Sequence, residues 1–298
     1  MGVIIIQIRR PLLIILMFVV AISFIITNNT KNDEELNDKI ITIQGVVKGK
    51  IEKKRYNQYK VGVFLINDYT KNKNLKIGQK VNITGKFKSL DKMKYDDFDY
   101  GRYIKSTGYK GIVYINNYKI IDKNKLYSLI GEIKFYISKT YRYLYKKNSD
   151  FINSILLAEV ENLTEEQKEI FTRTGTSHVI SISGLHTGIL CVIISFLLRG
   201  INKLYKLLIL SIFITLYCIM VGASPSIIRS IAFVMIFYLS IFIDRKKDGI
   251  SALSLIGIIL IMNNPYVIYN VSFQLSFLAT LSILIFYNKI NSLSLIHI

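Results

Sequence analysis

The alternation of apolar and polar positions divides the chain into three parts. Residues 11–27 form a continuous apolar run, which is long enough to cross a bilayer at a rise of about 1.5 Å per residue. Residues 28–173 are mixed, and from residue 174 onward apolar segments alternate with short polar connections. This pattern is typical of an integral membrane protein with one water-soluble insertion.

The apolar run at the start follows two arginines, Arg9 and Arg10. A signal peptide also begins with basic residues and an apolar stretch. However, the Asn-Asn-Thr-Lys that follows from residue 28 is a poor small-residue cleavage site. We therefore expect an uncleaved transmembrane anchor with both arginines in the cytoplasm.

The mixed part begins with short runs of β-forming residues, at 40–51, 59–69, 80–87 and 111–121. Apolar residues recur at every second position between Val81 and Phe87, as in a half-buried strand. Asn, Asp and Gly residues that favour turns separate the runs. The sequence predicts a small antiparallel β-barrel of OB type.

Helical patterns follow the predicted strands. Residues 95–109 predict a helix packed on the barrel, and the basic, aromatic segment 125–147 predicts a helix suited to a membrane interface. Residues 152–171 predict a pair of helices, and Thr164 with Gln167 forms a capping-box pattern at the start of the second.

The last part holds five apolar segments, at 178–198, 207–222, 227–243, 250–262 and 271–287. Lys and Arg residues follow the first and third segments but are absent from the connections after the second and fourth. By the positive-inside rule, the N-terminus lies in the cytoplasm and the barrel outside, in a multi-pass protein of the cytoplasmic membrane. Segment 250–262 reaches only about 20 Å, so it is either re-entrant or kinked near Pro265.

The predicted fold is therefore mixed: an OB-like barrel inserted after a transmembrane helix and followed by an α-helical multi-pass membrane domain. The boundaries are an anchor at 1–27, an extracytoplasmic β domain at 28–124, a helical connector at 125–173 and a membrane domain at 174–298.

Charge is concentrated in the soluble part. Residues 28–150 hold 27 Lys and Arg against 13 Asp and Glu, a net of 27 − 13 = +14, whereas the rest of the chain carries 12 − 7 = +5. A basic domain attracts polyanions, and an OB barrel binds single-stranded nucleic acid through cations and stacking aromatic rings. The candidate DNA-binding residues are Tyr56, Tyr59, Tyr69 and Lys60. The alternative is that the aromatic rings form the barrel core and the lysines a solvated face.

Polar residues also occur where the predicted membrane segments meet the outer side. Such residues are expensive in lipid and normally face protein or a water-filled path. The candidates for lining a path or for helix packing are His178, Ser181, Ser183, Gly184, His186, Ser224, Arg229 and Gln274. Arg229 reaching to the interface and Gln274 bonding between helices are the alternatives.

These polar residues do not predict catalysis. No acidic residue lies in the membrane segments to orient a histidine beside Ser183. His178 and His186 lack a third metal ligand, and Cys191 and Cys218 lie in apolar segments where inert, buried thiols are expected. We expect no enzyme activity, no metal and no cofactor.

Four spaced motifs resemble the ComEC competence family: Phe98-Asp-Tyr-Gly-Arg-Tyr-Ile-Lys-Ser-Thr-Gly, Arg173-Thr-Gly-Thr-Ser-His-Val-Ile-Ser-Ile-Ser-Gly-Leu-His, Gly222-Ala-Ser-Pro-Ser-Ile-Ile-Arg, and Asn264-Pro followed by Val-Ser-Phe-Gln-Leu-Ser-Phe. The resemblance implies a channel that passes one DNA strand into the cytoplasm during natural transformation, with an outer OB-like domain. Many members continue with more helices and a metallo-β-lactamase-like domain, so we expect a truncated, N-terminal part whose tail 291–298 matches nothing in the family.

The sequence thus favours a DNA-uptake protein with single-stranded DNA and the lipid bilayer as partners. Other competence proteins and an oligomer are further possible partners. Two alternatives stay open: a small-solute permease with broken helices, and a membrane-anchored module that binds anionic polymers.

Overall fold

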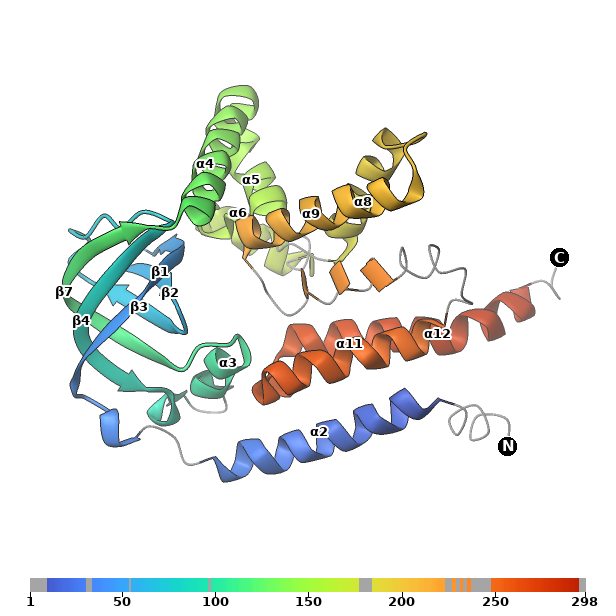
Figure 1. Cartoon of the computed structure of the whole chain (residues 1–298), viewed down its shortest axis with the longest axis horizontal. Coiled ribbons are helices and arrows are strands. Elements are labelled where there is room, and N and C mark those ends of the chain that lie inside the picture. The colour runs from blue at the N-terminus through green and yellow to red at the C-terminus, as the bar shows by residue number, and fades with distance from the viewer. Residues whose placement is uncertain are drawn as a thin grey trace.

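The computed structural model describes residues 10–30, 34–53, 55–95, 98–176, 184–222, 227–228, 231–232, 235–236 and 248–294. A β-barrel lies at one end of these residues, and the apolar helices extend away from it (Figure 1).

Five strands close the barrel in the order β1-β2-β3-β7-β4. They are β1 (Ile40–Glu52), β2 (Asn57–Val61), β3 (Phe64–Asp68), β4 (Gln79–Ser89) and β7 (Gly111–Lys123). The predicted small barrel is therefore confirmed. One detail was wrong, because β3 and β7 pair in parallel while the other four pairings are antiparallel. A parallel pair needs a long crossover, and here β4 and the segment up to residue 110 supply it.

The barrel core follows from the alternation that the sequence displays. In β4, Val81, Ile83 and Phe87 are buried, whereas the intervening Lys86 is exposed. Similar positions on the other strands, including Val47 and Ile66, complete the core. Each such side chain contributes roughly 1.5–3 kcal/mol by leaving water, so this alternation fixes which face of each strand turns inward.

The predicted run 59–69 is two strands rather than one. Gly62 has a φ of 58°, a conformation that glycine adopts without steric strain. It reverses the chain between β2 and β3, which pair antiparallel in a hairpin. The turn was missed because the run is rich in β-formers on both sides of a single glycine.

Helices flank the barrel at opposite ends of β4: α4 (Lys125–Tyr145) lies at its start and the short α3 (Tyr100–Ser106) at its end (Figure 1). Along the chain, a two-stranded sheet of β5 (Lys94–Tyr95) and β6 (Phe98–Asp99) and then α3 come between β4 and β7. α4 begins directly after β7, where the side chain of Asn124 accepts a hydrogen bond from the backbone of Tyr127.

Two shorter helices follow α4. They are α5 (Ser149–Leu157) and α6 (Glu165–Arg173), as the predicted helical pair requires. α6 starts with the predicted capping box, in which Thr164 and Gln167 satisfy each other's backbone N–H groups.

The N-terminal apolar run and four of the five later apolar segments form helices: α2 (Pro11–Asn29), α8 (Gly184–Leu197), α9 (Lys203–Val221), α11 (Gly249–Asn263) and α12 (Val271–Ser294). Most of the predicted segment 227–243 lies outside the described residues. A 3-10 helix, η5 (Pro265–Tyr269), joins the last two. α2, α11 and α12 run side by side (Figure 1), and an apolar cluster around Ile256 and Phe273 packs between them. By length and composition, two described helices, α2 and α9, are able to cross a membrane.

Candidate functional site

Three tyrosines with neighbouring rings form a partly exposed aromatic surface on the barrel, which we call the tyrosine face: Tyr56, Tyr69 and Tyr114. Tyr69 is exposed, whereas Tyr56 and Tyr114 are half-buried. Tyr56 precedes β2, Tyr69 follows β3, and Tyr114 lies on β7. The ring centroids of Tyr56 and Tyr69 are 4.8 Å apart, and those of Tyr69 and Tyr114 are 5.8 Å apart. Tyr69 is 55% exposed. The hairpin and the parallel β3–β7 pairing together bring these three residues to one place.

A cation lies beside the tyrosine face. The Nζ of Lys53 donates a hydrogen bond of 3.1 Å to the Tyr56 hydroxyl and lies 5.1 Å from the centroid of its ring. Arg55, between them in the sequence, is exposed. Exposed rings next to positive charge are able to stack on bases and to contact phosphates.

Two of the four barrel residues predicted to bind DNA lie elsewhere. Tyr59 has no exposed surface, and its hydroxyl donates to the carbonyl of Lys73, so its ring is core and is not available for stacking. Lys60 lies four residues along the chain from Tyr56 and is half-buried near Lys134 and Glu161, where burial lowers the pKa of its ammonium. The structure therefore removes Tyr59 from the candidates and separates Lys60 from Tyr56 and Tyr69.

A buried carboxylate organises the loop that carries Tyr69. Asp68 is fully buried and accepts three hydrogen bonds. They come from the backbone N–H of Thr70 (3.1 Å), the Thr70 hydroxyl (2.6 Å) and the backbone N–H of Lys73 (3.1 Å). The loop after β3 is thereby fixed from within.

A second polar region joins the barrel to the apolar helices, and we call it the junction. The Nδ2 of Asn264 donates to the carbonyls of Lys105 (2.8 Å) and Ser106 (3.3 Å). The buried Asn270 donates to the Ser106 hydroxyl at 3.1 Å. The guanidinium of Arg102 lies 4.5 Å from the centroid of the Tyr269 ring. Residues of α3 thus pack against η5 and its flanking asparagines.

The end of α2 completes the junction. The Ser23 hydroxyl donates to the carbonyl of Pro265 at 2.7 Å, and the hydroxyls of Thr27 and Tyr269 are 3.0 Å apart. A polar hollow opens beside them, in which Lys105 pairs with Asp91 at 2.6 Å. These contacts tie together three segments that lie far apart in the sequence.

The polar candidates of the membrane part are only partly described. His178, Ser181, Ser183, Ser224 and Arg229 lie outside the described residues. Gly184 is the first residue of α8, and His186 is half-buried in its first turn. Gln274 donates from Nε2 to the carbonyl of Ile268 at 2.6 Å, so it holds η5 against the start of α12.

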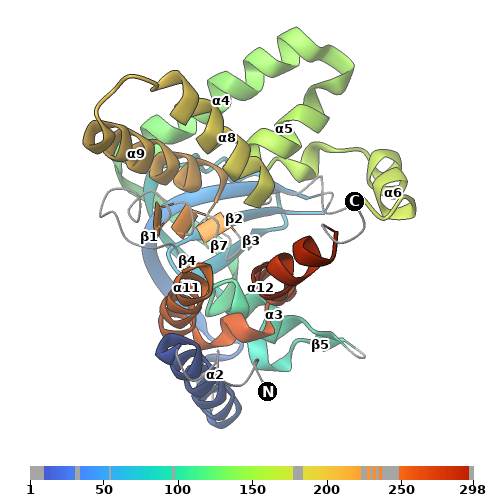
Figure 2. The same cartoon turned by 90° about the vertical axis from the view of Figure 1, so that its right-hand side faces the viewer.

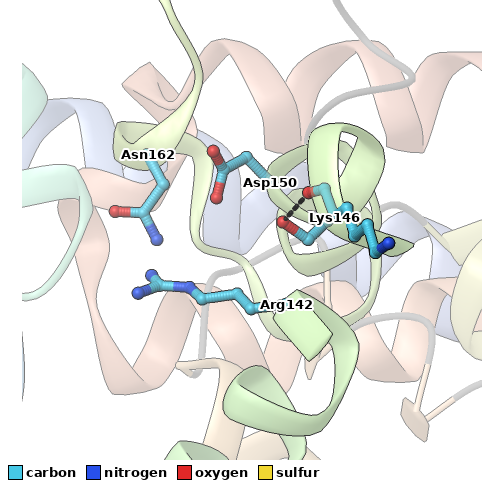
Figure 3. Close-up of a pocket in the computed structure, with 5 residues that line it drawn as sticks. Arg142, Lys146, Asp150 and Asn162 are labelled. Atoms are coloured by element: carbon cyan, nitrogen blue, oxygen red, sulfur yellow. Dashed lines mark hydrogen bonds between the residues drawn. The ribbon is translucent and has the colours of Figure 1, made fainter. Parts of the chain in front are cut away.

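A further hollow lies where α4 meets α5. It is lined by Arg142, Lys146, Ser149, Asp150 and Asn162. Figure 3 shows the Arg142 guanidinium beside Asn162 and Asp150, while the Lys146 ammonium points away. The Asp150 carboxylate opposes the single cation here, so the hollow is not suited to an anion. Within the described part of the chain, no three His, Cys, Asp or Glu side chains come together as metal ligands would.

Comparison with known proteins decides the family. Residues 155–295 match the family model described as Competence, competence protein. "ComE operon protein 3" of Bacillus subtilis (strain 168) is 26% identical over 165 residues, which are 55% of this chain and 21% of that protein. Residues 155–295 are a competence domain of the ComEC family.

Other matches add less. An uncharacterized protein of Aquifex aeolicus (strain VF5) is 30% identical to this chain over 125 residues, which are 42% of this chain and 30% of that protein. The chain therefore spans less than a third of the length of these relatives. The aspartyl tRNA synthetase from Entamoeba histolytica aligns with 63% of this chain and 44% of its own, at 11% identity and a TM-score of 0.23, which says nothing about fold.

The junction is the polar region of the competence protein that sequence reasoning missed. Apart from the end of α2, its α3 and η5 residues lie within the motifs at 98–108 and 264–277, but polar groups near apolar segments suggested a path through the membrane. Asn264 and Asn270, which flank η5, were the available signal, because a buried amide group needs hydrogen-bond partners. Ser106 supplies one partner to each of them.

Asp68 provides a test of the loop that carries Tyr69 in the competence protein. We expect Asp68→Ala to lower the free energy of unfolding by about 2 kcal/mol, because buried donors lose their acceptor. Thermal unfolding of the purified full chain measures this, and hydrogen exchange at residues 70 and 73 should accelerate. Asp68→Asn keeps one acceptor oxygen and should lose clearly less. Equal stability of all three proteins would contradict the assigned role.

Proposed function

We propose that this competence protein acts in DNA uptake. Its barrel binds the incoming single strand, and its apolar helices form part of the passage across the cytoplasmic membrane. The tyrosine face carries this proposal, because the exposed ring of Tyr69 and the half-buried rings next to it, beside Lys53, match the way single strands are bound without sequence preference. The five-stranded closed barrel supports the narrower assignment to the OB type.

The helix ends support a multi-pass arrangement. At the start of α2 and of α11, Arg10 and Asp248 lie 3.6 Å apart. At their other ends, the hydroxyls of Thr30 and Tyr266 are 3.2 Å apart. The two helices therefore run in the same direction, as the charge pattern requires if both start in the cytoplasm. On this proposal the barrel is extracytoplasmic, and the junction holds it at the outer ends of the helices.

The polar residues at the outer ends keep their proposed role beside this passage. His178, Ser181, Ser183, Gly184, His186, Ser224 and Arg229 are proposed to line or brace its entrance. Gln274 fits a bracing role, since its hydrogen bond to Ile268 shapes the connection between α11 and α12.

Salt dependence of DNA binding tests the proposal. The purified full chain should bind single-stranded oligothymidine, with affinity falling roughly tenfold or more from low to physiological salt, because phosphate contacts release counterions. Fluorescence anisotropy measures this. The control is polyphosphate of equal charge, which has no bases to stack and should bind more weakly at every salt concentration.

The two alternatives give different outcomes. Equal affinity for oligothymidine and polyphosphate would favour a module for anionic polymers and contradict the role of the tyrosine face. Absence of binding to both would favour the solute permease.

A further inference from the structure

Helix α4 leaves an apolar stripe uncovered. Its first four residues recur at spacings of three and four, and the last two follow two turns later, which places all six along one side of a helix. They are Leu126, Leu129, Ile133, Tyr136, Tyr143 and Leu144, with exposed fractions between 44% and 81%. Ile130 and Ser138, which lie off this stripe, pack inward and are only 7% and 6% exposed, whereas Phe135 (71%) and Tyr145 (49%) are exposed apolar residues outside the stripe. The packing of α4 on the rest of the chain therefore does not account for this stripe.

Positive charge accompanies the stripe. Between residues 125 and 147 the exposed cations are Lys125, Lys139, Arg142, Lys146 and Lys147, against one exposed carboxylate, Glu132. An apolar side that includes tyrosines and is flanked by lysine and arginine is the composition of a helix that lies in the surface of a bilayer. Anionic headgroups complement such charge.

The position of α4 agrees with this composition. α4 and α11 run in clearly different directions in Figure 1, and Figure 2 shows α11 close to end-on while α4 extends across the view. α4 is also connected to α9 through its neighbour α5. The Tyr217 hydroxyl of α9 donates a hydrogen bond of 3.1 Å to the carbonyl of Leu156 in α5. Tyr217 lies near the end of α9 that is closer to the barrel.

We propose that α4 lies in the outer surface of the bilayer, with its apolar stripe at the boundary of headgroups and acyl chains and its cations on anionic phospholipid. The inference rests on the proposed crossing of the membrane by α9. A helix that runs across the direction of α9 (Figure 1) and is connected near its outer end follows the bilayer plane. α4 then supports the barrel on the membrane at a second place, separate from the junction.

Tryptophan fluorescence tests the position of α4, because the chain contains no tryptophan. Tyr136→Trp labels the stripe, and Phe213→Trp labels the middle of α9 as a reference. The full chain is reconstituted in vesicles of neutral and anionic phospholipid brominated either near the headgroup or deep in the acyl chain. We expect Tyr136→Trp to be quenched at least about twofold more by the shallow label, and Phe213→Trp more by the deep label.

The reference separates the possible failures. If Phe213→Trp is quenched but Tyr136→Trp is quenched by neither label, α4 does not lie in the membrane, although α9 does. A blue-shifted but unquenched Tyr136→Trp would mean that protein, such as a second copy of the chain, covers the stripe, which also overturns the inference. If neither tryptophan is quenched, the membrane arrangement itself fails.

A charge reversal tests the preference for anionic lipid. Lys139→Glu with Arg142→Glu, made in the Tyr136→Trp protein, should reduce shallow quenching about twofold in anionic vesicles and little in neutral ones. Lys48→Glu with Lys119→Glu makes the same change of charge at exposed barrel positions and should leave quenching unaltered. Equal quenching in both double variants would overturn the role of these two cations.

Discussion

Replacing Gly101 by alanine is expected to lower the free energy of unfolding by about 3 kcal/mol. A Cβ at this position would collide with the carbonyl oxygen of Leu90 and lie 2.7 Å from its carbonyl carbon. Because both partners are backbone, neither can yield without moving α3 off the barrel. Thermal unfolding of the full chain measures the loss, and protease cleavage around residues 90–98 should become faster.

A second glycine serves as the matched control. Gly188 lies in α8, and a Cβ added there meets no atom within 4 Å. Gly188→Ala should therefore be neutral or slightly stabilising, by up to about 1 kcal/mol, since alanine is the better helix former. If Gly101→Ala is as stable as Gly188→Ala, the close approach of α3 to Leu90 is not a constraint on this fold.

Removing the rings of the tyrosine face should weaken binding of single-stranded DNA more than any other surface change on the barrel. Loss of a stacked ring reduces affinity by about 1–3 kcal/mol, which corresponds to roughly 5- to 150-fold. We therefore expect Tyr56→Ala and Tyr69→Ala each to raise the Kd of the full chain for oligothymidine within this range. The stability of both variants should be measured alongside the Kd, so that a binding defect is distinguished from unfolding.

Two controls separate stacking from exposure alone. Tyr69→Phe keeps the ring and should bind nearly as well as the unaltered protein. Phe98→Ala removes a ring that is 53% exposed, close to the 55% of Tyr69, but that lies on β6 outside the tyrosine face, and should also bind normally. A loss in Phe98→Ala equal to that in Tyr69→Ala would contradict a specific role for the face.

The sequence predicted those elements whose cause is local. The alternation from Val81 to Phe87 anticipates both the strand and its inward side, because a side chain on a strand points opposite to its neighbour. The capping pattern at Thr164 and Gln167 likewise depends on residues within one turn. Apolar length alone was sufficient to place α2 and α9.

Long-range pairing decided what the sequence did not predict. Tyr56, Tyr59 and Tyr69 are the same residue type and have similar neighbours in the sequence. Only the hairpin at Gly62 and the closure of the barrel turn Tyr59 inward and leave Tyr69 exposed. The contribution of Tyr114 depends on the pairing of β7 with β3, a contact between segments nearly fifty residues apart (Asn67 with Tyr114). No local pattern reports such a pairing.

The junction has a consequence for how a bound strand would travel. Asn264 holds backbone carbonyls of α3, and Asn270 holds the Ser106 hydroxyl, so the barrel has little freedom to swivel on the helices. A DNA strand bound to a barrel with a fixed orientation would always enter from the same direction relative to the helices. For the proposed function, the fold itself then sets the orientation of the bound strand, and no separate movement of the barrel is needed to bring each nucleotide to the entrance of the passage.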